Sequence, residues 1–171
     1  MRISQASAID ITSLVQLVNS AYRGPESLKG WTSEATLLDG QRTDADQLQA
    51  LIAMPGTCLL LAKEEDELLG SVLLQRETDA FYLGMLTVRP VLQGGGIGKK
   101  LMQAAEAFVS EQGGTRVVIT VISVRTELIA WYARKGYQDT GVRKPFPADP
   151  AFGIPRQPIE FIVMQKNLVA R

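Results

Sequence analysis

A glycine-rich segment from Gln93 to Lys99 separates a strand-like apolar run, residues 81–88, from a helical pattern over residues 98–112. It carries four of the chain's 15 glycines within five positions, more than a tight strand-to-helix turn needs. Glycine has no Cβ, so backbone N–H groups can converge on one point, and the first turn of the helix adds unpaired donors and a positive dipole end. The segment therefore predicts a strand, a loop that binds phosphate oxygens and a helix in immediate succession.

The segment does not match the two common nucleotide-binding loops. A Walker loop requires Gly-x-x-x-x-Gly-Lys-Ser/Thr, but Gln93 occupies its first glycine position and Lys100 its Ser/Thr position. The dinucleotide fingerprint Gly-x-Gly-x-x-Gly fails as well, because Lys99 or Leu101 stands where its last glycine is required. The sequence therefore disfavours a nucleoside triphosphate with magnesium, and also a dinucleotide, as the phosphate ligand.

The composition narrows the chemistry further. The chain has 171 residues, of which 46% are apolar, enough for one compact domain with a sizeable core. Its 18 Lys and Arg residues balance 18 Asp and Glu residues, so neither nucleic acid nor a membrane surface is expected as a partner. It contains no histidine and one cysteine, Cys58, which excludes a Ser-His-Asp set, a His-ligated metal and an internal disulfide. We therefore expect chemistry without a metal.

Neither a membrane span nor an export signal is expected. The apolar run at residues 117–122 is far shorter than the roughly 18 residues needed to cross a bilayer. The N-terminus, Met1 to Gln5, lacks a basic start followed by an apolar stretch. A cytoplasmic location follows as the default expectation.

The apolar periodicity predicts an α/β fold in which helices flank a mixed sheet. Helices are expected over residues 7–22, from Thr43 to about residue 53, over 98–112 and over 126–135. Strands are expected near the N-terminus and at residues 58–63, 68–75, 81–88, 116–122, 137–142 and 159–166. The connection at residues 144–158 holds five of the eight prolines and is expected to lack secondary structure. It is either functional or a stiff tether between the last two strands.

The glycine segment also fits the pattern Gln/Arg-x-x-Gly-x-Gly/Ala, preceded by Val88-x-Pro90 and a hydrophobic strand. In this setting the chain resembles the GNAT superfamily of N-acetyltransferases, which bind acetyl-coenzyme A (acetyl-CoA). The resemblance extends from the first helix to the last strand. It implies a single domain over residues 1–171, with an acceptor-side segment at 1–57 and an acetyl-CoA-binding core at 81–137. It also implies a mostly antiparallel sheet that splays between its fourth and fifth strands to admit the cofactor.

The resemblance assigns the contacts with acetyl-CoA to the loop and to the strand before it. Backbone amides of five loop residues would hold the pyrophosphate: Gln93, Gly94, Gly96, Gly98 and Lys99. The main chain of Leu86 and Val88 would bind the pantetheine arm. Gly84 would mark the bulge that the family has in this strand, and a glycine inside a strand is independently a bulge signal.

A second motif lies at residues 128–137, where Tyr132 stands four positions before Gly136, which an aromatic residue follows. This arrangement is similar to the family's other signature and implies that Tyr132 is the general acid. A thiol pKa of about 8.5, against about 10 for tyrosine, lets a phenol hydrogen-bond to the departing sulfur or protonate it. Without the first motif, Tyr132 would be interpreted as an ordinary core aromatic.

The chain departs from the family pattern at two places. Arg125 stands seven positions before Tyr132, where many members have Asn, and it would meet either a phosphate of coenzyme A or solvent. In addition, residues 81–88 hold no carboxylate that could take the proton of the amine. The base must therefore lie elsewhere, or the amine must lose its proton through ordered water as it enters a dry site.

Three carboxylates are candidates for this base: Glu34, Asp39 and Asp44. Glu34 is preferred as the catalytic residue because, beside Trp31, it would form an acidic and aromatic pocket for a cationic amine. The alternative interpretation of Glu34 is a first-turn helix carboxylate, and that of Asp44 is an N-terminal helix residue.

Together the motifs predict transfer of an acetyl group from acetyl-CoA to a primary amine by direct attack. The alternatives are a catalytically idle coenzyme A-binding or sensor module and a structural domain that binds no coenzyme A. The acceptor would be a small-molecule or peptide amine, because four residues indicate an aromatic and acidic pocket: Trp31, Glu34, Phe146 and Phe152. A polyamine, an aminoglycoside, an amino acid or a peptide N-terminus would each fit it. The resemblance also makes a homodimer an expectation.

Overall fold

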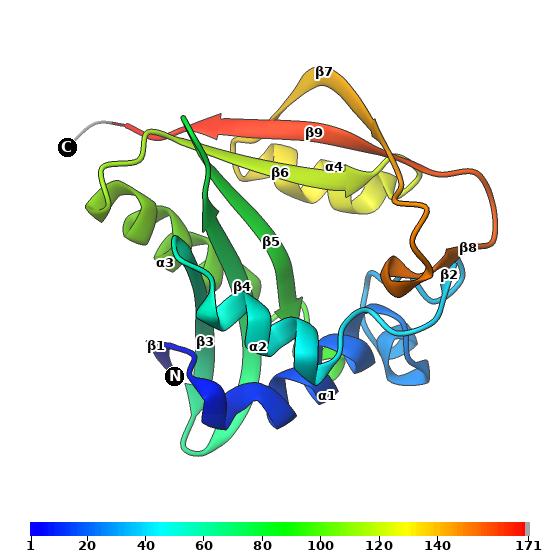
Figure 1. Cartoon of the computed structure of the whole chain (residues 1–171), viewed down its shortest axis with the longest axis horizontal. Helices are drawn as coiled ribbons and strands as arrows, with labels where there is room; N and C mark the ends of the chain where they lie inside the picture. Colours follow the sequence, from blue (N-terminus) through cyan, green and yellow to red (C-terminus); the bar gives the residue numbers. More distant parts are fainter. Residues whose placement is uncertain (170–171) are drawn as a thin grey trace.

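The computed structural model describes residues 1–169, in which seven strands form one mixed sheet (Figure 1). In sheet order the strands are β1 (Arg2–Gln5), β3 (Thr57–Glu64), β4 (Glu67–Arg76), β5 (Phe81–Val88), β6 (Arg116–Ile122), β9 (Glu160–Asn167) and β7 (Gln138–Pro145). Each neighbouring pair is antiparallel except β5 and β6, which are parallel. The expected α/β class with a mostly antiparallel sheet is confirmed.

The sheet divides between β5 and β6, which are the fourth and fifth of the strands expected from the sequence. These strands pair only at Phe81 with Val117 and at Tyr82 with Val118, and then they diverge (Figure 1). From Leu83 onward β5 remains paired with β4, whereas β6 is paired with β9 along its whole length. The expected splay between the two strands is therefore confirmed.

Two pairs of helices cover opposite faces of the sheet. They are α1 (Ile11–Tyr22) with α2 (Ala45–Ala53), and α3 (Ile97–Glu111) with α4 (Thr126–Arg134). Side chains of β3 alternate between the two layers, because Leu59 and Leu61 pack with α1 and α2, whereas Cys58 and Leu60 pack with α3 and α4. No helix within residues 1–169 is long and apolar enough to cross a membrane.

The starts of the first two helices differ slightly from the expected ones. The backbone N–H of Ser7 donates to Asp10 Oδ2 at 2.9 Å, and a 3₁₀ turn, Ala8–Asp10, precedes α1. α2 begins after Asp44 instead of at Thr43, because the Asp44 carboxylate accepts the Gln47 backbone N–H at 2.8 Å and so caps the helix. Pattern alone does not separate two adjacent residues that both favour the N-cap position.

The proline-rich connection at residues 144–158 has secondary structure, which corrects the expectation. It contains a 3₁₀ turn, Pro150–Phe152, and the strand β8 (Ile154–Pro155). β8 pairs with β2 (Leu38–Asp39) in a separate two-stranded sheet (Figure 1). The connection is therefore fastened to the N-terminal part of the chain and is not a simple tether between the last two strands.

Candidate active site

A bulge in β5 lies beside the divergence of β5 and β6. Leu73 pairs with Gly84 and Ser71 with Thr87, so β5 has one more residue than β4 over this stretch. Met85 has the left-handed φ of +46° at this point. The register shift thus lies next to Gly84, as expected, but Met85 is the residue that adopts the unusual backbone conformation.

Two tyrosines bridge the elements around this bulge. The absence of a Cβ at Gly84 makes room for Tyr82, since an added Cβ would lie 2.7 Å from its ring. The Tyr82 hydroxyl lies 3.3 Å from Thr120 Oγ1 on β6, so this side chain crosses between the diverging strands. The Tyr22 hydroxyl at the end of α1 donates to the Leu86 carbonyl at 3.0 Å. α1, β5 and β6 are therefore held together by side chains where the main-chain pairing has ended.

The glycine loop leads from β5 to α3 through a 3₁₀ turn at Pro90–Leu92. Gly94 and Gly96 have positive φ angles of +88° and +89°, and an added Cβ at either would meet no atom within 4 Å. Gly96 is also the N-cap of α3, and no side chain caps the N-terminus of this helix. The N–H groups of the first turn of α3 are therefore available to an external acceptor, and the open space beside the glycines leaves room for one.

A first cavity of about 410 Å³ borders this loop, β5 and α4. All seven residues expected to bind the cofactor line it: Leu86, Val88, Gln93, Gly94, Gly96, Gly98 and Lys99. The charged residues in its lining are all cationic: Lys99, Arg125, Arg134 and Lys135. Positive charge, free helix N–H groups and bare glycines together suit the anionic pyrophosphate of acetyl-CoA.

The side chain of Gln93 fixes the loop relative to its neighbours. Its Nε2 donates to the Val88 carbonyl at 3.2 Å, and its Oε1 accepts the Trp31 backbone N–H at 3.0 Å. Gly30 leaves room for this amide, because an added Cβ there would overlap with it. The carbonyls of Val88 and Leu86 thus each accept one side-chain hydrogen bond, and a carbonyl oxygen has two lone pairs, so a ligand could use the second.

Tyr132 lies on α4 with only 7% of its surface exposed. Its ring packs edge-on against Trp131 and Tyr137, with ring centroids 5.2 and 5.8 Å apart. Burial, with a smaller contribution from Tyr22, raises the pKa of Tyr132 well above its usual value. The phenol is therefore protonated, and able to donate, throughout the physiological pH range.

A second cavity of about 270 Å³ adjoins the first. The two share five lining residues: Tyr22, Leu86, Arg125, Leu128 and Tyr132. Glu34, Phe146 and Phe152 line the second cavity, as expected for one pocket. Trp31 does not join them, because it lines the first cavity, where its ring centroid lies 6.4 Å from that of Trp131. The expected pairing of Glu34 with Trp31 in one pocket is therefore wrong.

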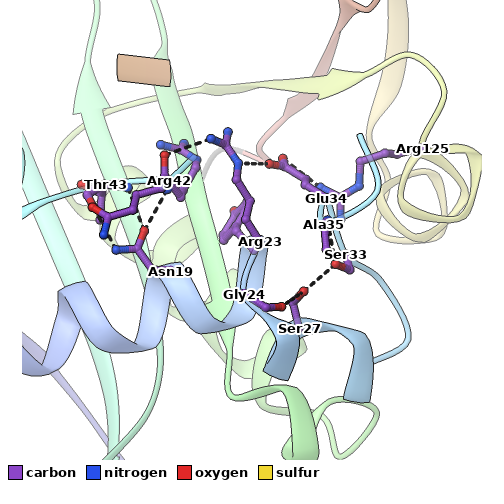
Figure 2. A network of polar contacts seen from close by, with 12 residues as sticks. Asn19, Arg23, Gly24, Ser27, Ser33, Glu34, Ala35, Arg42, Thr43 and Arg125 are labelled. Carbon is purple, nitrogen blue, oxygen red and sulfur yellow. Dashed lines mark hydrogen bonds and ion pairs between the residues drawn. The ribbon is translucent and has the colours of Figure 1, made fainter. Parts of the chain in front are cut away.

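Both carboxylate oxygens of Glu34 are engaged by guanidinium groups (Figure 2). Oε2 accepts from Arg23 Nε at 3.0 Å, and Oε1 accepts from Arg125 Nη1 at 3.1 Å. Arg125 Nη2 also donates to Thr32 Oγ1 at 2.6 Å. Glu34 and Arg125 are each only 6% exposed, so Arg125 is not solvated. Glu34 lies in an irregular segment and not in the first turn of a helix, and its role as the base stays a prediction.

The other two carboxylates considered as bases have structural partners. Arg156 Nη2 lies 2.6 Å from Asp39 Oδ1, and this guanidinium holds the pKa of Asp39 below its usual value. Asp44 caps α2, and neither residue lines either cavity. Within residues 1–169, no group of three or more metal-ligating side chains is placed to hold an ion.

Three residues of the second cavity carry no signal in the sequence: Tyr22, Arg23 and Arg42. Tyr22 has the helical spacing of an ordinary core residue, and its burial raises its pKa to about 12. Arg23 follows the end of α1, and Arg42 lies in an irregular stretch before α2. Arg42 reaches the cavity that Arg23 lines because the chain folds back onto α1, where Asn19 binds the main chain of Arg42 and Thr43.

Comparison with known proteins points to one family. A family model described as an acetyltransferase (GNAT) domain matches residues 28–147. A search among curated proteins found no match.

Solved structures share the fold over nearly the whole chain. The ribosomal-protein-alanine N-acetyltransferase from Brucella melitensis aligns with a TM-score of 0.72 and 20% identity, over 98% of this chain and 100% of its own. The paia N-acetyltransferase from Thermoplasma acidophilum, in complex with coenzyme A, aligns with a TM-score of 0.72 and 18% identity, over 98% of this chain and 99% of its own. The yncA protein from Salmonella typhimurium, a putative acetyltransferase with its cofactor acetyl-CoA, aligns with a TM-score of 0.72 and 20% identity, over 100% of this chain and 95% of its own.

Proposed function

Because the chain belongs to the GNAT acetyltransferase family, we propose that it moves an acetyl group from acetyl-CoA to a primary amine by direct attack of the amine. One observation carries this proposal. Tyr132, a protonated and buried phenol, lines the first cavity, which suits the cofactor, and also the adjoining second cavity. A proton donor shared by two cavities stands where an acetyl donor and an amine would meet.

The first cavity would hold the cofactor through main-chain donors and nearby cations. Backbone N–H groups at Gly94, Gly96 and the first turn of α3 would bind the pyrophosphate, since the helix dipole and the absence of Cβ atoms favour an anion there. Lys99 and Lys135 add positive charge to the same lining. When bound, acetyl-CoA would supply the acetyl group as a thioester.

Tyr132 would donate the proton of its hydroxyl group to the departing sulfur of coenzyme A. A nitrogen–carbon bond forms as the carbon–sulfur bond breaks, one amine proton is lost and the sulfur gains one, which gives an amide and a free thiol. The raised pKa keeps the phenol in its donor form. A positioned acid of this kind contributes about 10²- to 10⁴-fold to the rate.

Glu34 is the sequence-based candidate for the group that takes the amine's proton. Its contacts favour another role, because protonation would remove the charge that holds Arg23 and Arg125 in a buried site. A water-mediated loss of the proton, or entry of the amine in its neutral form, needs no such disruption. We propose that Glu34 positions the two arginines.

Thiol release from acetyl-CoA tests the proposed activity. The protein would be mixed with acetyl-CoA and a panel of amino acids, polyamines, aminoglycosides and peptides, and coenzyme A binding would be measured by calorimetry in parallel. We expect thiol release with at least one class, saturable in both substrates. Binding of coenzyme A without release across the panel would instead favour the idle binding or sensor module. If the protein bound no coenzyme A at all, the result would favour the third alternative, a structural domain.

A Gly96→Asp variant tests the cofactor site itself. It places a side chain and a negative charge in the open space beside the N-terminus of α3, so coenzyme A affinity should fall by more than about tenfold. Gly113→Asp is the matched control, because Gly113 has a similar φ of +80°, faces equally open space and lies near the other end of α3. Affinity that is retained in Gly96→Asp would contradict the assignment of the loop.

A further inference from the structure

The second cavity is lined by more positive than negative charge. Its charged lining residues are Arg23, Arg42, Arg125 and Glu34, which gives a net charge of +2. This reverses the acidic character expected from the sequence. An acceptor with several amines and no anionic group would enter a field of its own sign, which disfavours binding.

Glu34 offers no free carboxylate to a cationic acceptor. Its two oxygens accept from Arg23 at 3.0 Å and from Arg125 at 3.1 Å, and all three side chains are buried. Two of the three guanidinium groups, those of Arg23 and Arg125, thus share Glu34, which is the one carboxylate in the lining. One carboxylate balances only one of these two positive charges, so one surplus charge stays within the Arg23–Glu34–Arg125 cluster, and Arg42, which has no carboxylate partner in residues 1–169, supplies the other.

Arg42 is half-buried and has no anionic partner within the described residues, 1–169. No carboxylate of this part of the chain lies within ion-pair distance of its guanidinium, in contrast to Arg23 and Arg125. Its Cζ lies 5.3 Å from the centre of the Tyr22 ring, which lines the same cavity. A guanidinium held over an aromatic ring keeps its planar set of N–H donors, which can meet a planar anion.

The main chain at Arg42 is held in place by Asn19 on α1 (Figure 2). Asn19 Oδ1 accepts the backbone N–H groups of Arg42 at 2.8 Å and of Thr43 at 2.9 Å, and Asn19 Nδ2 donates to the Thr43 carbonyl at 2.9 Å. Thr43 is buried. The backbone of Arg42 is therefore fixed before any ligand binds, which lowers the entropy cost of binding.

We propose that the acceptor carries a carboxylate beside its amine, as an amino acid does, and that Arg42 binds this carboxylate. The inference rests on the proposed function, because it names the substrate class of the same site. Arginine is suited to this task since its planar fork donates two parallel hydrogen bonds to a carboxylate. Three aromatic rings, those of Phe146, Phe152 and Phe161, also line the cavity, and a volume of about 270 Å³ fits one small molecule with an apolar side chain.

Equilibrium binding to the protein loaded with coenzyme A tests the inference without turnover. Leucine, methionine and phenylalanine would each be compared by calorimetry with the matching carboxamide, at about pH 6, where the α-amino group is protonated. We expect at least one amino acid to bind about 10- to 100-fold more tightly than its carboxamide. Equal affinities, or tighter binding of spermidine or an aminoglycoside, would overturn the inference. Absence of thiol release would count against the proposed function and not against this comparison.

An Arg42→Gln variant assigns the effect to one side chain. Its KM for the preferred amino acid should rise about 10- to 100-fold with little change in kcat, whereas the carboxamide and coenzyme A should bind as before. Arg42→Lys should recover part of the loss, because it restores the charge without the fork. Arg143→Gln is the control, since Arg143 is exposed on β7, pairs with Asp139 and lines neither cavity. An equal loss for amino acid and carboxamide in Arg42→Gln would contradict the proposed contact.

Discussion

Replacement of Tyr132 by Phe removes one hydroxyl and keeps the ring that packs against Trp131 and Tyr137. We expect kcat to fall about 10²- to 10⁴-fold, because the departing sulfur loses its proton donor. Coenzyme A affinity and thermal stability should remain near those of the wild type. Thiol-release kinetics and calorimetry on one preparation measure both quantities. An unchanged kcat would remove Tyr132 from the mechanism, and a parallel loss of affinity would indicate a packing role.

Residues that lie close together in the sequence are those whose positions could be predicted. The seven residues expected to bind the cofactor fall within residues 86–99, so one strand and one loop bring them to one cavity. The two guanidinium partners of Glu34, by contrast, lie 11 and 91 positions away. Contacts between distant elements depend on packing, which spacing does not record. The sequence therefore indicated an acidic pocket where the structure has a neutralised carboxylate.

At the scale of single elements, Asp10 links the start of α1 to β3. It accepts the Ser7 N–H and the Lys63 ammonium, the latter at 2.7 Å. Burial alone would raise the pKa of Asp10, but the hydrogen bonds from Lys63 and Ser7 hold it below its usual value. Because the folded-state pKa is depressed, the stabilisation is present above the unfolded-state pKa, near 3.8, and is lost as the pH falls through the folded-state pKa.

An Asp10→Asn variant should therefore show a pH-dependent loss of stability. We expect its free energy of unfolding to lie about 1 kcal/mol below that of the wild type near neutral pH, and the difference to shrink toward about pH 3. Urea unfolding of both proteins over this range measures the difference. A gap that stays constant with pH would show that the carboxylate charge is not its source.

The long helices and strands can be predicted from the periodicity of apolar residues, whereas the two shortest strands cannot. β6 begins and ends at the expected residues, 116 and 122, because buried positions recur along it in an alternating pattern. β2 and β8 have two residues each, too few to show a period, and among residues 1–169 each pairs only with the other. Their formation depends on the approach of two segments more than 100 positions apart, which proline and glycine content alone does not reveal.

At the scale of the whole molecule, Glu34 connects the segment after α1 to Arg125, which precedes the helix that carries Tyr132. A Glu34→Gln change leaves two buried guanidinium groups without their counter-charge, so the free energy of unfolding should fall by about 3–5 kcal/mol. Urea unfolding measures this loss. Glu26→Gln is the control from the same segment, because its exposed pair with Lys29 should contribute less than about 1 kcal/mol.

Kinetics of the same Glu34→Gln variant separate positioning from proton transfer. If Glu34 positions the arginines, KM for the acceptor should rise while the pH profile of kcat keeps its shape. If Glu34 takes the amine's proton, kcat should fall and the acidic limb of the profile should disappear. The second outcome would restore the catalytic role that the sequence suggested.

The small sheet of β2 and β8 fastens together two segments that line the cavity proposed for the acceptor. These segments supply Glu34, Arg42, Phe146 and Phe152 to the second cavity, whereas β5, which lines both cavities, belongs to the seven-stranded sheet. Acceptor preference can therefore be redesigned by grafting both segments together onto an unaltered scaffold. If only one of the two segments were grafted, its strand would lack the partner strand with which it pairs in this protein.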